Sequence, residues 1–259
     1  MQALLDWTLA LDVAEAVLFA TIVNVVVFVL AVLGGQAVVA LWRHRPVSAP
    51  SPPLTARELW LAAVCVVLNT AVMLAGWALF RAGLVEVSGD TSLVWWVLDA
   101  AVLVAIMDLA MYTTHRLAHH PLLFRLVHSA HHAYDAPRPL TLFVLHPLEV
   151  LGFGGLWLVV LATHTYSLGG ILAYLTINTV FGTLGHVSVE PLPRSFARWP
   201  VLGLMGTSTF HARHHQSPST NFGFYTALWD RLFGTLDPAY AETFAAPPTE
   251  PASARSTRA

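Results

Sequence analysis

The stretch 115-HRLAHHPLLFRLVHSAHH-132 places six histidines within eighteen residues. It lies in a chain of 259 residues that is 56% hydrophobic and only 11% charged. Soluble domains rarely combine so many apolar residues with so few charges, so the composition favours a membrane protein. Neutral imidazole is a good ligand for Fe, Zn, Cu and Ni ions. The stretch therefore predicts a metal centre attached to a membrane-embedded fold.

The apolar runs around this stretch predict an all-α fold, a polytopic helical membrane protein. A hydrocarbon core is crossed by roughly 20 helical residues, and three runs reach this length, at about 16–42, 59–80 and 93–114. Two more apolar runs, 143–162 and 168–185, are consistent with either two full spans or a re-entrant pair. The first run is too long for a signal peptide and has no basic residues before it, so it is expected to remain as a helix.

The arginines predict the orientation of these helices. All thirteen basic side chains are arginine, and basic residues concentrate on the cytoplasmic side of a membrane. If the loop 43–58 is cytoplasmic, five alternating spans leave only Arg81 outside. This orientation predicts an integral protein of the cell inner membrane, with the histidine-rich sections forming a helical cap on the cytoplasmic face.

Other function classes receive little support. The net charge is −2 and no basic stripe is present, so nucleic-acid binding is not expected. Cys65 is the single cysteine, which excludes a disulfide within the chain and a metal site built from cysteines.

The histidines fall into three spaced clusters: HxxxH at 115–119, HxxHH at 128–132 and HxxHH at 211–215. On a helix, positions i, i+3 and i+4 share one face, so each cluster is expected to aim its imidazoles at one point. Eight histidines exceed the ligands that one four- to six-coordinate ion uses. The count therefore predicts a dinuclear site.

Five segments carry a resemblance to a known family: 108-DLAMYTTHRLAHH-120, the two HxxHH boxes, 146-HPLE-149 and 221-NFGFYTALWDRLFGT-235. Together they resemble the fatty acid hydroxylase / sterol desaturase superfamily of integral-membrane di-iron oxygenases, over about residues 93–236. The resemblance implies two iron ions (Fe2+/Fe3+), with zinc as a substitute in purified protein, and O2 as co-substrate. It also implies the metal ligands, which are His115, His119, His128, His131, His132, His186, His211, His214 and His215.

The activity implied by the resemblance is hydroxylation or desaturation of an unactivated C–H bond in a lipid. Candidate substrates are a fatty acyl chain, a sterol or hopanoid, and a carotenoid. The chain has no haem, flavin or iron–sulfur signature, so electrons are expected from a ferredoxin or a cytochrome with its reductase. Two alternatives stay open at this point: a metal-binding membrane transporter and a zinc-dependent membrane hydrolase.

Several residues near the clusters are assigned separate roles. Asp108 and Tyr112 lie seven and four residues before His115, and are predicted to support the catalytic site, with the Asp108 carboxylate accepting the far N–H of a ligand imidazole. His146 and Glu149 are expected beside the site without an assigned role. His120 precedes Pro121 and is expected to act as a helix cap or surface group.

The domain organisation follows from these segments. Residues 1–92 are predicted to hold N-terminal transmembrane helices and a cytoplasmic loop, and residues 93–239 a fatty acid hydroxylase-like di-iron catalytic domain. Residues 240–259 lack periodicity and are predicted to form a disordered tail. The glycines of 152-GFGG-155 are expected to permit close helix packing.

Overall fold

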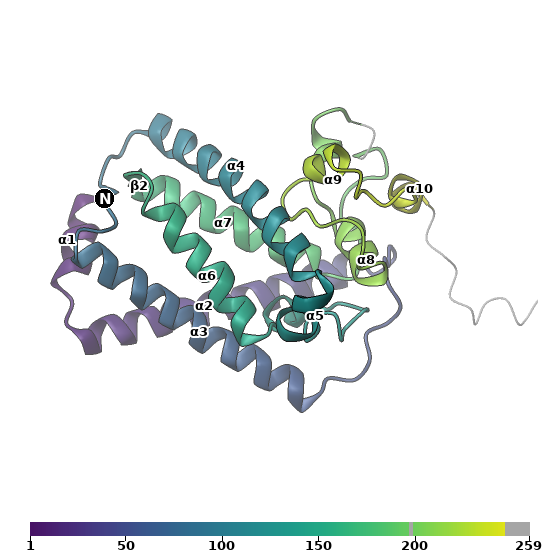
Figure 1. The fold of residues 1–259 in the computed structure, drawn as a ribbon, viewed down its shortest axis with the longest axis horizontal. Helices are drawn as coiled ribbons and strands as arrows, with labels where there is room; N and C mark the ends of the chain where they lie inside the picture. Colours follow the sequence, from purple (N-terminus) through teal and green to yellow (C-terminus); the bar gives the residue numbers. More distant parts are fainter. Residues whose placement is uncertain (197–198, 247–259) are drawn as a thin grey trace, which may run out of the picture.

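The computed structural model describes residues 1–196 and 199–246, and these form an almost entirely helical fold (Figure 1). Four helices are long and apolar enough to cross a membrane: α2 (Val13–Trp42), α3 (Ala56–Arg81), α4 (Leu93–Ala118) and α7 (Leu168–Gly185). The predicted all-α membrane fold class is confirmed.

The remaining elements are short. The helices are α1 (Gln2–Ala10), α5 (Pro121–Val127), α6 (Pro147–Leu161), α8 (Ser208–Gln216), α9 (Leu228–Leu232) and α10 (Tyr240–Ala245), with the 3-10 turns η1 (Pro139–Phe143) and η3 (Leu202–Leu204). Two strands, β1 (Val87–Ser88) and β2 (Tyr166–Ser167), pair in parallel with Val87 opposite Tyr166. This small sheet links the turn before α4 to the turn before α7.

Local sequence fixes where the first long helices begin. Asp12 accepts a hydrogen bond from the Glu15 amide at 2.9 Å, and the Glu15 carboxylate accepts one from the Asp12 amide at 2.9 Å. Thr55 and Glu58 form the same reciprocal arrangement at the start of α3. Such capping boxes satisfy amide donors that have no partner in the first helical turn. The residues at which α2 and α3 begin are therefore specified by a few neighbouring residues in the sequence.

Helices α6 and α7 form a hairpin that leaves the histidine-rich region and returns to it. α6 begins immediately after His146, and α7 ends immediately before His186. α4 packs along α7, and α3 packs along α6. The 15 residues of α6 extend about 22 Å, which is shorter than the roughly 30 Å hydrocarbon core. The pair is thus a hairpin with one arm of spanning length and one shorter arm.

The five apolar helices alternate in direction, so all histidine clusters gather at one end of the bundle. α8, α9 and α10 cluster where α2 and α7 end, as Figure 1 shows. The loop after α2 is tied to this end, because the Val47 amide donates to the Ser188 carbonyl at 3.0 Å. Arg81 lies at the opposite end, where its guanidinium donates to the Leu11 carbonyl at 3.4 Å. The predicted separation of Arg81 from the histidine-rich sections is present in the fold.

The N-terminal helices share a hydrophobic core with the rest of the chain. Ala62 and Cys65 of α3 are buried against Val144 and Val150. A Cβ atom at Gly154 of α6 would lie 2.5 Å from the nearer Val72 methyl group, so α6 approaches α3 closely at this glycine. The predicted role in close packing therefore holds for Gly154 but not for Gly152 or Gly155, where a Cβ would meet nothing within 4 Å. Because the core is shared, the domain boundary predicted at residue 92 stays a proposal based on the sequence pattern.

The prediction of a disordered tail starting at residue 240 is wrong for its first six residues. Tyr240–Ala245 form α10, in which Tyr240 and Phe244 are each only 2% exposed. Both rings pack in a cluster with Phe210 of α8. The i, i+4 spacing of the two aromatic residues gives this short helix an apolar face. The rest of the predicted tail, residues 247–259, lies outside the described residues.

Candidate metal centre

Nine histidine side chains converge in two adjoining groups. The five-histidine group contains His115, His119, His128, His132 and His214, and the four-histidine group contains His131, His186, His211 and His215. Within each group, one nitrogen of every ring lies within 4.8 Å of the others. Donors this close can share an ion at about 2.0–2.1 Å, the usual metal–imidazole distance. All nine histidines that the resemblance nominated as ligands are therefore brought together.

Each group draws on segments that are distant in the sequence. α4 supplies His115, and His119 follows its last residue. α8 supplies His211, His214 and His215, and His186 follows the last residue of α7. The middle cluster is not on a helix, contrary to the expectation. His128 ends α5, and Pro121 starts that helix only seven residues earlier. The His131 and His132 amides both donate to the His128 carbonyl, at 3.1 and 3.2 Å, which keeps a helix-like turn there.

The expectation that each cluster aims at one point is wrong for both HxxHH boxes. His128 and His132 belong to the five-histidine group, whereas His131 belongs to the four-histidine group. In the other box, His211 and His215 share a group and His214 joins the other. The cause is the geometry of a helical turn, which 211–215 adopt on α8 and the hydrogen-bonded turn at 128–132 approximates: i and i+4 lie about 40° apart around the axis, whereas i+3 and i+4 lie about 100° apart. Each box therefore contributes to both groups and fixes their spacing.

Hydrogen bonds to the outer ring nitrogens define how the imidazoles are oriented. Nδ1 of His115 lies 2.8 Å from the Phe222 carbonyl, Nδ1 of His214 lies 2.7 Å from the Thr220 carbonyl, and Nδ1 of His186 lies 2.7 Å from the Gly182 carbonyl. A carbonyl oxygen only accepts, so Nδ1 carries the proton in each of these rings. Their Nε2 atoms are left with a free lone pair that faces the centre of the group.

Convergent lone pairs are the observation that tests whether a cation fits. Nε2 of His115 and Nε2 of His128 are 3.0 Å apart. The Nδ1 of His128 lies 2.6 Å from the Glu149 carboxylate, so both Nε2 atoms of this pair bear lone pairs. Two facing lone pairs repel one another, and a cation between them removes the repulsion. Nε2 of His132 and Nε2 of His214 are likewise 3.0 Å apart. The donor set fits two metal ions.

Burial keeps these imidazoles neutral. Loss of hydration, with the neighbouring His115 and His186, lowers the pKa of His132 to about 3. Burial and neighbouring histidines also lower the pKa of His211, His214 and His215 well below the ordinary histidine value. Neutral imidazole is the form that binds metal ions. The site is therefore ready to accept cations without first releasing protons.

Glu149 is a functional residue whose role the sequence did not specify. It is buried, and its carboxylate accepts the Nδ1 hydrogen of His128 at 2.6 Å. Carboxylates in this position fix the orientation of a ligand imidazole and increase its basicity. His146, three residues earlier, instead caps α6 by accepting from the Leu148 amide at 3.2 Å. His120 caps α5 in the same way, as expected.

The sequence predicts that Asp108 and Tyr112 support the ligand imidazoles, but neither residue forms a hydrogen bond with one of them. The Asp108 carboxylate accepts from the Thr226 hydroxyl at 2.6 Å and from the Trp229 indole at 3.0 Å. Seven helical residues correspond to about 10.5 Å along the axis, which places Asp108 too far below His115 to reach its ring. Tyr112 bonds to the Thr235 hydroxyl at 3.0 Å. Both residues instead anchor the loop that follows α8, residues 217–235, which includes the short helix α9.

That loop is organised by two polar residues that the sequence analysis did not single out. The buried Asp230 carboxylate accepts from the Phe222 and Gly223 amides at 2.8 and 2.7 Å. Asn221 adopts a left-handed backbone with φ of 59°, and its side chain donates to the Phe210 carbonyl at 3.0 Å. The Phe222 carbonyl that orients His115 is thereby fixed. The available signal was Asp230 itself, an acidic residue within the mainly apolar segment 228-LWDRLF-233.

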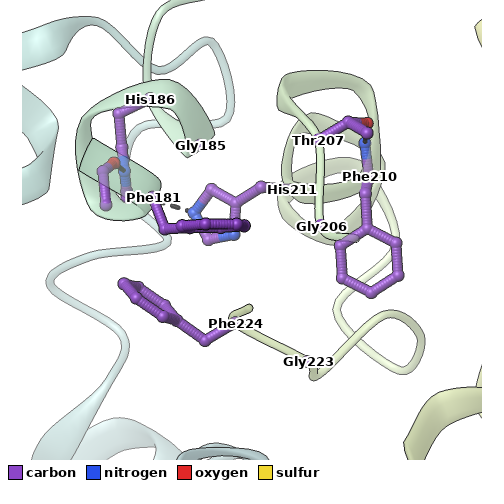
Figure 2. Close-up of a pocket in the computed structure, with 10 residues that line it drawn as sticks. Phe181, Gly185, His186, Gly206, Thr207, Phe210, His211, Gly223 and Phe224 are labelled. Carbon is purple, nitrogen blue, oxygen red and sulfur yellow. Dashed lines mark hydrogen bonds between the residues drawn. The ribbon is translucent and has the colours of Figure 1, made fainter. Parts of the chain in front are cut away.

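A small cavity opens beside the four-histidine group. Figure 2 shows the His211 ring reaching from α8 toward His186, with Phe181 and Phe224 next to it. The cavity holds about 10 Å³, which is room for one water-sized molecule. Its aromatic walls and the backbone of Gly206 restrict what can approach these two imidazoles.

The fold and the site define a helical membrane protein whose bundle carries two adjoining histidine groups suited to metal ions. The chain belongs to the fatty acid hydroxylase family, whose model matches residues 100–235. The predicted resemblance is confirmed.

Plant proteins are among the similar relatives. Protein CER1-like 2 of Arabidopsis thaliana is 33% identical over 165 residues, covering 59% of this chain and 27% of the relative. Very-long-chain aldehyde decarbonylase GL1-1 of Oryza sativa subsp. indica is 37% identical over 141 residues, covering 52% and 23%. The chain thus spans about a quarter of the length of these relatives. No solved structure matches the chain.

Proposed function

We propose that the protein is a membrane-bound oxidoreductase that uses two iron ions and O2 to oxidise an unactivated C–H bond of a lipid. Hydroxylation is the expected outcome when oxygen is retained, and desaturation when a second hydrogen is lost. The two histidine groups would each hold one iron ion. Bound iron supplies the O2 activation and hydrogen abstraction that no side chain of this site performs.

The observation that carries the proposal is the pairing of free lone pairs across each group. Nδ1 hydrogen bonds, to the Glu149 carboxylate for His128 and to backbone carbonyls for the other three rings, leave Nε2 atoms 3.0–3.4 Å apart in the His115–His128 and His131–His186 pairs. The ligand set is almost wholly neutral, with Glu149 as a carboxylate that contacts a ligand ring. A catalytic zinc site typically has three protein ligands. Nine histidines therefore favour a dinuclear oxidase over the zinc-dependent hydrolase.

The transporter alternative is less consistent with the position of the histidines. Transporters commonly place their ligands near the middle of the membrane, on interrupted helices. Here the histidine groups lie at the ends of α4 and α7 and on α8. This position suits a lipid that enters from the bilayer and reacts at its surface.

We further propose that the histidine end faces the cytoplasm of an inner membrane, where an external ferredoxin or cytochrome with reductase delivers electrons. The arginines support this orientation, because Arg81 is the one arginine at the opposite end among residues 1–196 and 199–246. Arg45 and Arg138 lie at the histidine end, donating to the Leu192 and Pro52 carbonyls.

A second candidate reaction comes from the relatives. Several of them are named very-long-chain aldehyde decarbonylases, including one from Oryza sativa subsp. indica that is 30% identical over 178 residues. A long-chain aldehyde would then be the substrate, and the products would be a hydrocarbon one carbon shorter and carbon monoxide. Mass spectrometry separates the candidates, because hydroxylation adds 16 mass units, desaturation removes two and loss of carbon monoxide removes 28.

The proposal is tested with purified protein in detergent. We expect about two iron ions per chain and O2 consumption that requires both a reduced donor and lipid. His131→Ala should abolish O2 consumption, whereas the matched control His164→Ala, an exposed histidine beside β2, should not. Full activity of His131→Ala would contradict the proposal. Turnover without O2 or reductant would favour hydrolysis, and metal uptake into proteoliposomes would favour transport.

A further inference from the structure

A second, much larger cavity opens beside the five-histidine group. Its volume is about 1110 Å³, comparable to or above the roughly 300–1,000 Å³ of typical ligand sites. The walls are mainly apolar and include Leu117, Phe124 and Phe222. His119 lines the cavity, so it reaches one of the imidazoles proposed as metal ligands. This cavity is widely open to the surface, and it has room for a chain-like molecule next to a proposed metal ligand.

Two arginines line the same cavity. Arg116 lies near the end of α4 and Arg125 on α5, and both are exposed. Among the described residues, neither guanidinium has a carboxylate within 4.0 Å, whereas Arg138 and Arg213 pair with Glu58 and Asp237. The positive charges of the cavity are therefore available to a bound anion.

The Arg116 side chain is oriented by buried partners. Its guanidinium donates to the Tyr112 hydroxyl at 3.1 Å. Tyr112 is only 2% exposed, bonds to Thr235 and stacks on Phe233 with ring centroids 5.6 Å apart. An arginine held in this way loses less conformational freedom when it binds a carboxylate or phosphate. Arg116 thus has the properties of a built anion contact.

The surface next to the cavity is apolar. Leu117, Leu122 and Leu126 are exposed by 55%, 76% and 60%. Leu117 also lines the cavity, and Leu122 directly follows its lining residue Pro121. Exposed leucines at the end of a membrane-spanning helix are expected to contact lipid. A ligand that reaches the cavity across this surface has an apolar body.

We infer that this cavity binds a single-chain lipid with an anionic head, a carboxylate or a phosphate, through Arg116 and Arg125. The chain lies along the apolar wall, and the head group is held at the rim between the two guanidinium groups. That this lipid is the substrate rests on the proposed function, whereas the binding itself does not. The arginines act as binding groups that select the head and position the chain against His119.

The experiment measures binding without turnover, using the full chain purified in an uncharged detergent. Radiolabelled oleate, oleyl phosphate and the neutral oleyl alcohol are the three probes. The variants are Arg116→Gln, Arg125→Gln and the double variant, with Arg57→Gln as the matched control. Arg57 is exposed at the start of α3 and does not line the cavity.

We expect the double variant to bind at least one anionic probe about tenfold more weakly, the loss typical of a charged hydrogen bond. Binding of oleyl alcohol and the metal content should stay within twofold of the parent, and Arg57→Gln should match the parent throughout. Oleate and oleyl phosphate show which head the arginines prefer.

Three results would overturn the inference. The first is unchanged affinity of the double variant for both anionic probes. The second is an equal loss of oleate and oleyl alcohol affinity, because anion recognition would then play no part. The third is a variant that slows electron delivery from the redox partner while binding oleate normally, which would assign the arginines to that partner. Selective oleate binding in a protein that consumes no O2 would contradict the proposed function alone.

Discussion

Adjacent histidines in this protein point to different metal positions. His214 belongs to the five-histidine group and His215 to the four-histidine group. The same split separates His131 from His132. Because side chains one residue apart on a helix leave the axis in directions about 100° apart, one short box can serve two ions and fix the distance between them.

The split predicts a specific outcome for neighbouring variants. His214→Ala and His215→Ala should each lower the iron content from about two ions per chain to about one, and the double variant should retain neither. The measurement is metal analysis after a chelator wash. His120→Ala, an exposed histidine outside both groups, is the control and should keep both ions. Loss of both ions in each single variant would show that the groups do not bind independently.

Glu149 allows a second prediction at the residue scale. Glu149→Leu removes the carboxylate that holds Nδ1 of His128, so metal affinity should fall by about 10–100-fold, as for other partners of ligand imidazoles. Chelator competition measures this change. Glu86→Leu serves as the control. In the parent protein the Glu86 carboxylate accepts a hydrogen bond from the Thr165 hydroxyl, at the end of the bundle opposite the histidines. Equal affinity in Glu149→Leu and the parent protein would remove Glu149 from the site.

At the level of elements, the site depends on how α4 holds the loop after α8. Asp108 bonds to Thr226 and Trp229, and Asp230 within the loop fixes the Phe222 carbonyl that orients His115. The Asp108 carboxylate, which the sequence suggested as a hydrogen-bond partner of a ligand imidazole, therefore acts on the ligands indirectly, by holding this loop in place. The structure assigns to Asp108 a role in stability that also maintains ligand geometry.

Asp108→Asn tests this role. The amide replaces one acceptor oxygen by a donor, so one or more charge-assisted hydrogen bonds are lost, at about 1.5–3 kcal/mol each. Thermal unfolding in detergent should show this destabilisation, and iron content should fall with it. Asp6→Asn, on the exposed face of α1, should unfold like the parent. Parent-like stability of Asp108→Asn would contradict the role assigned to this carboxylate.

The contact of α6 with α3 provides another element-scale prediction. A Cβ at Gly154 would lie 2.5 Å from the Val72 side chain, whereas a Cβ at Gly155 meets nothing within 4 Å. Gly154→Ala should therefore destabilise the protein by about 1–3 kcal/mol through overpacking. Gly155→Ala should be neutral or stabilising by up to about 1 kcal/mol, since alanine favours helix over glycine. Unfolding curves of the two variants give the comparison, and equal midpoints would contradict the close packing at Gly154.

At the scale of the whole molecule, alternation of the helices sets one histidine-rich end against an end that carries Arg81 and acidic residues such as Asp12 and Glu86. α2, α4 and α7 end where the histidines lie, and α3 and α6 begin there. The proposed orientation follows from this arrangement together with the arginines.

Labelling of single cysteines tests the orientation. Thr91→Cys lies at the end opposite the histidines and should react with a membrane-impermeant maleimide in intact cells. His44→Cys lies at the histidine end and should react only after the membrane is opened. The native Cys65 is buried and is expected to stay unlabelled. The reverse pattern would place the metal centre outside the cytoplasm.

The sequence by itself determined the fold class, the long helices and the nine histidines that converge. These depend on local properties: runs of apolar residues, capping residues such as Thr55, and ligand-type side chains at helical spacing. The sequence did not reveal that each HxxHH box divides between two groups, that Glu149 holds His128, or that Asp108 clamps a loop. It also missed α10, whose two aromatic residues become an apolar face only when α8 packs against them.

Only the tertiary structure decided these points, because each depends on which segment meets another across a long sequence separation. Nothing near His115 in the sequence indicates that its Nδ1 meets the carbonyl of Phe222, 107 residues away. The same holds for the cavity whose lining includes Arg116, Arg125 and His119. Local sequence specifies the ligands and the helices that carry them, and packing of those helices selects the partner of each ring and the access to the site.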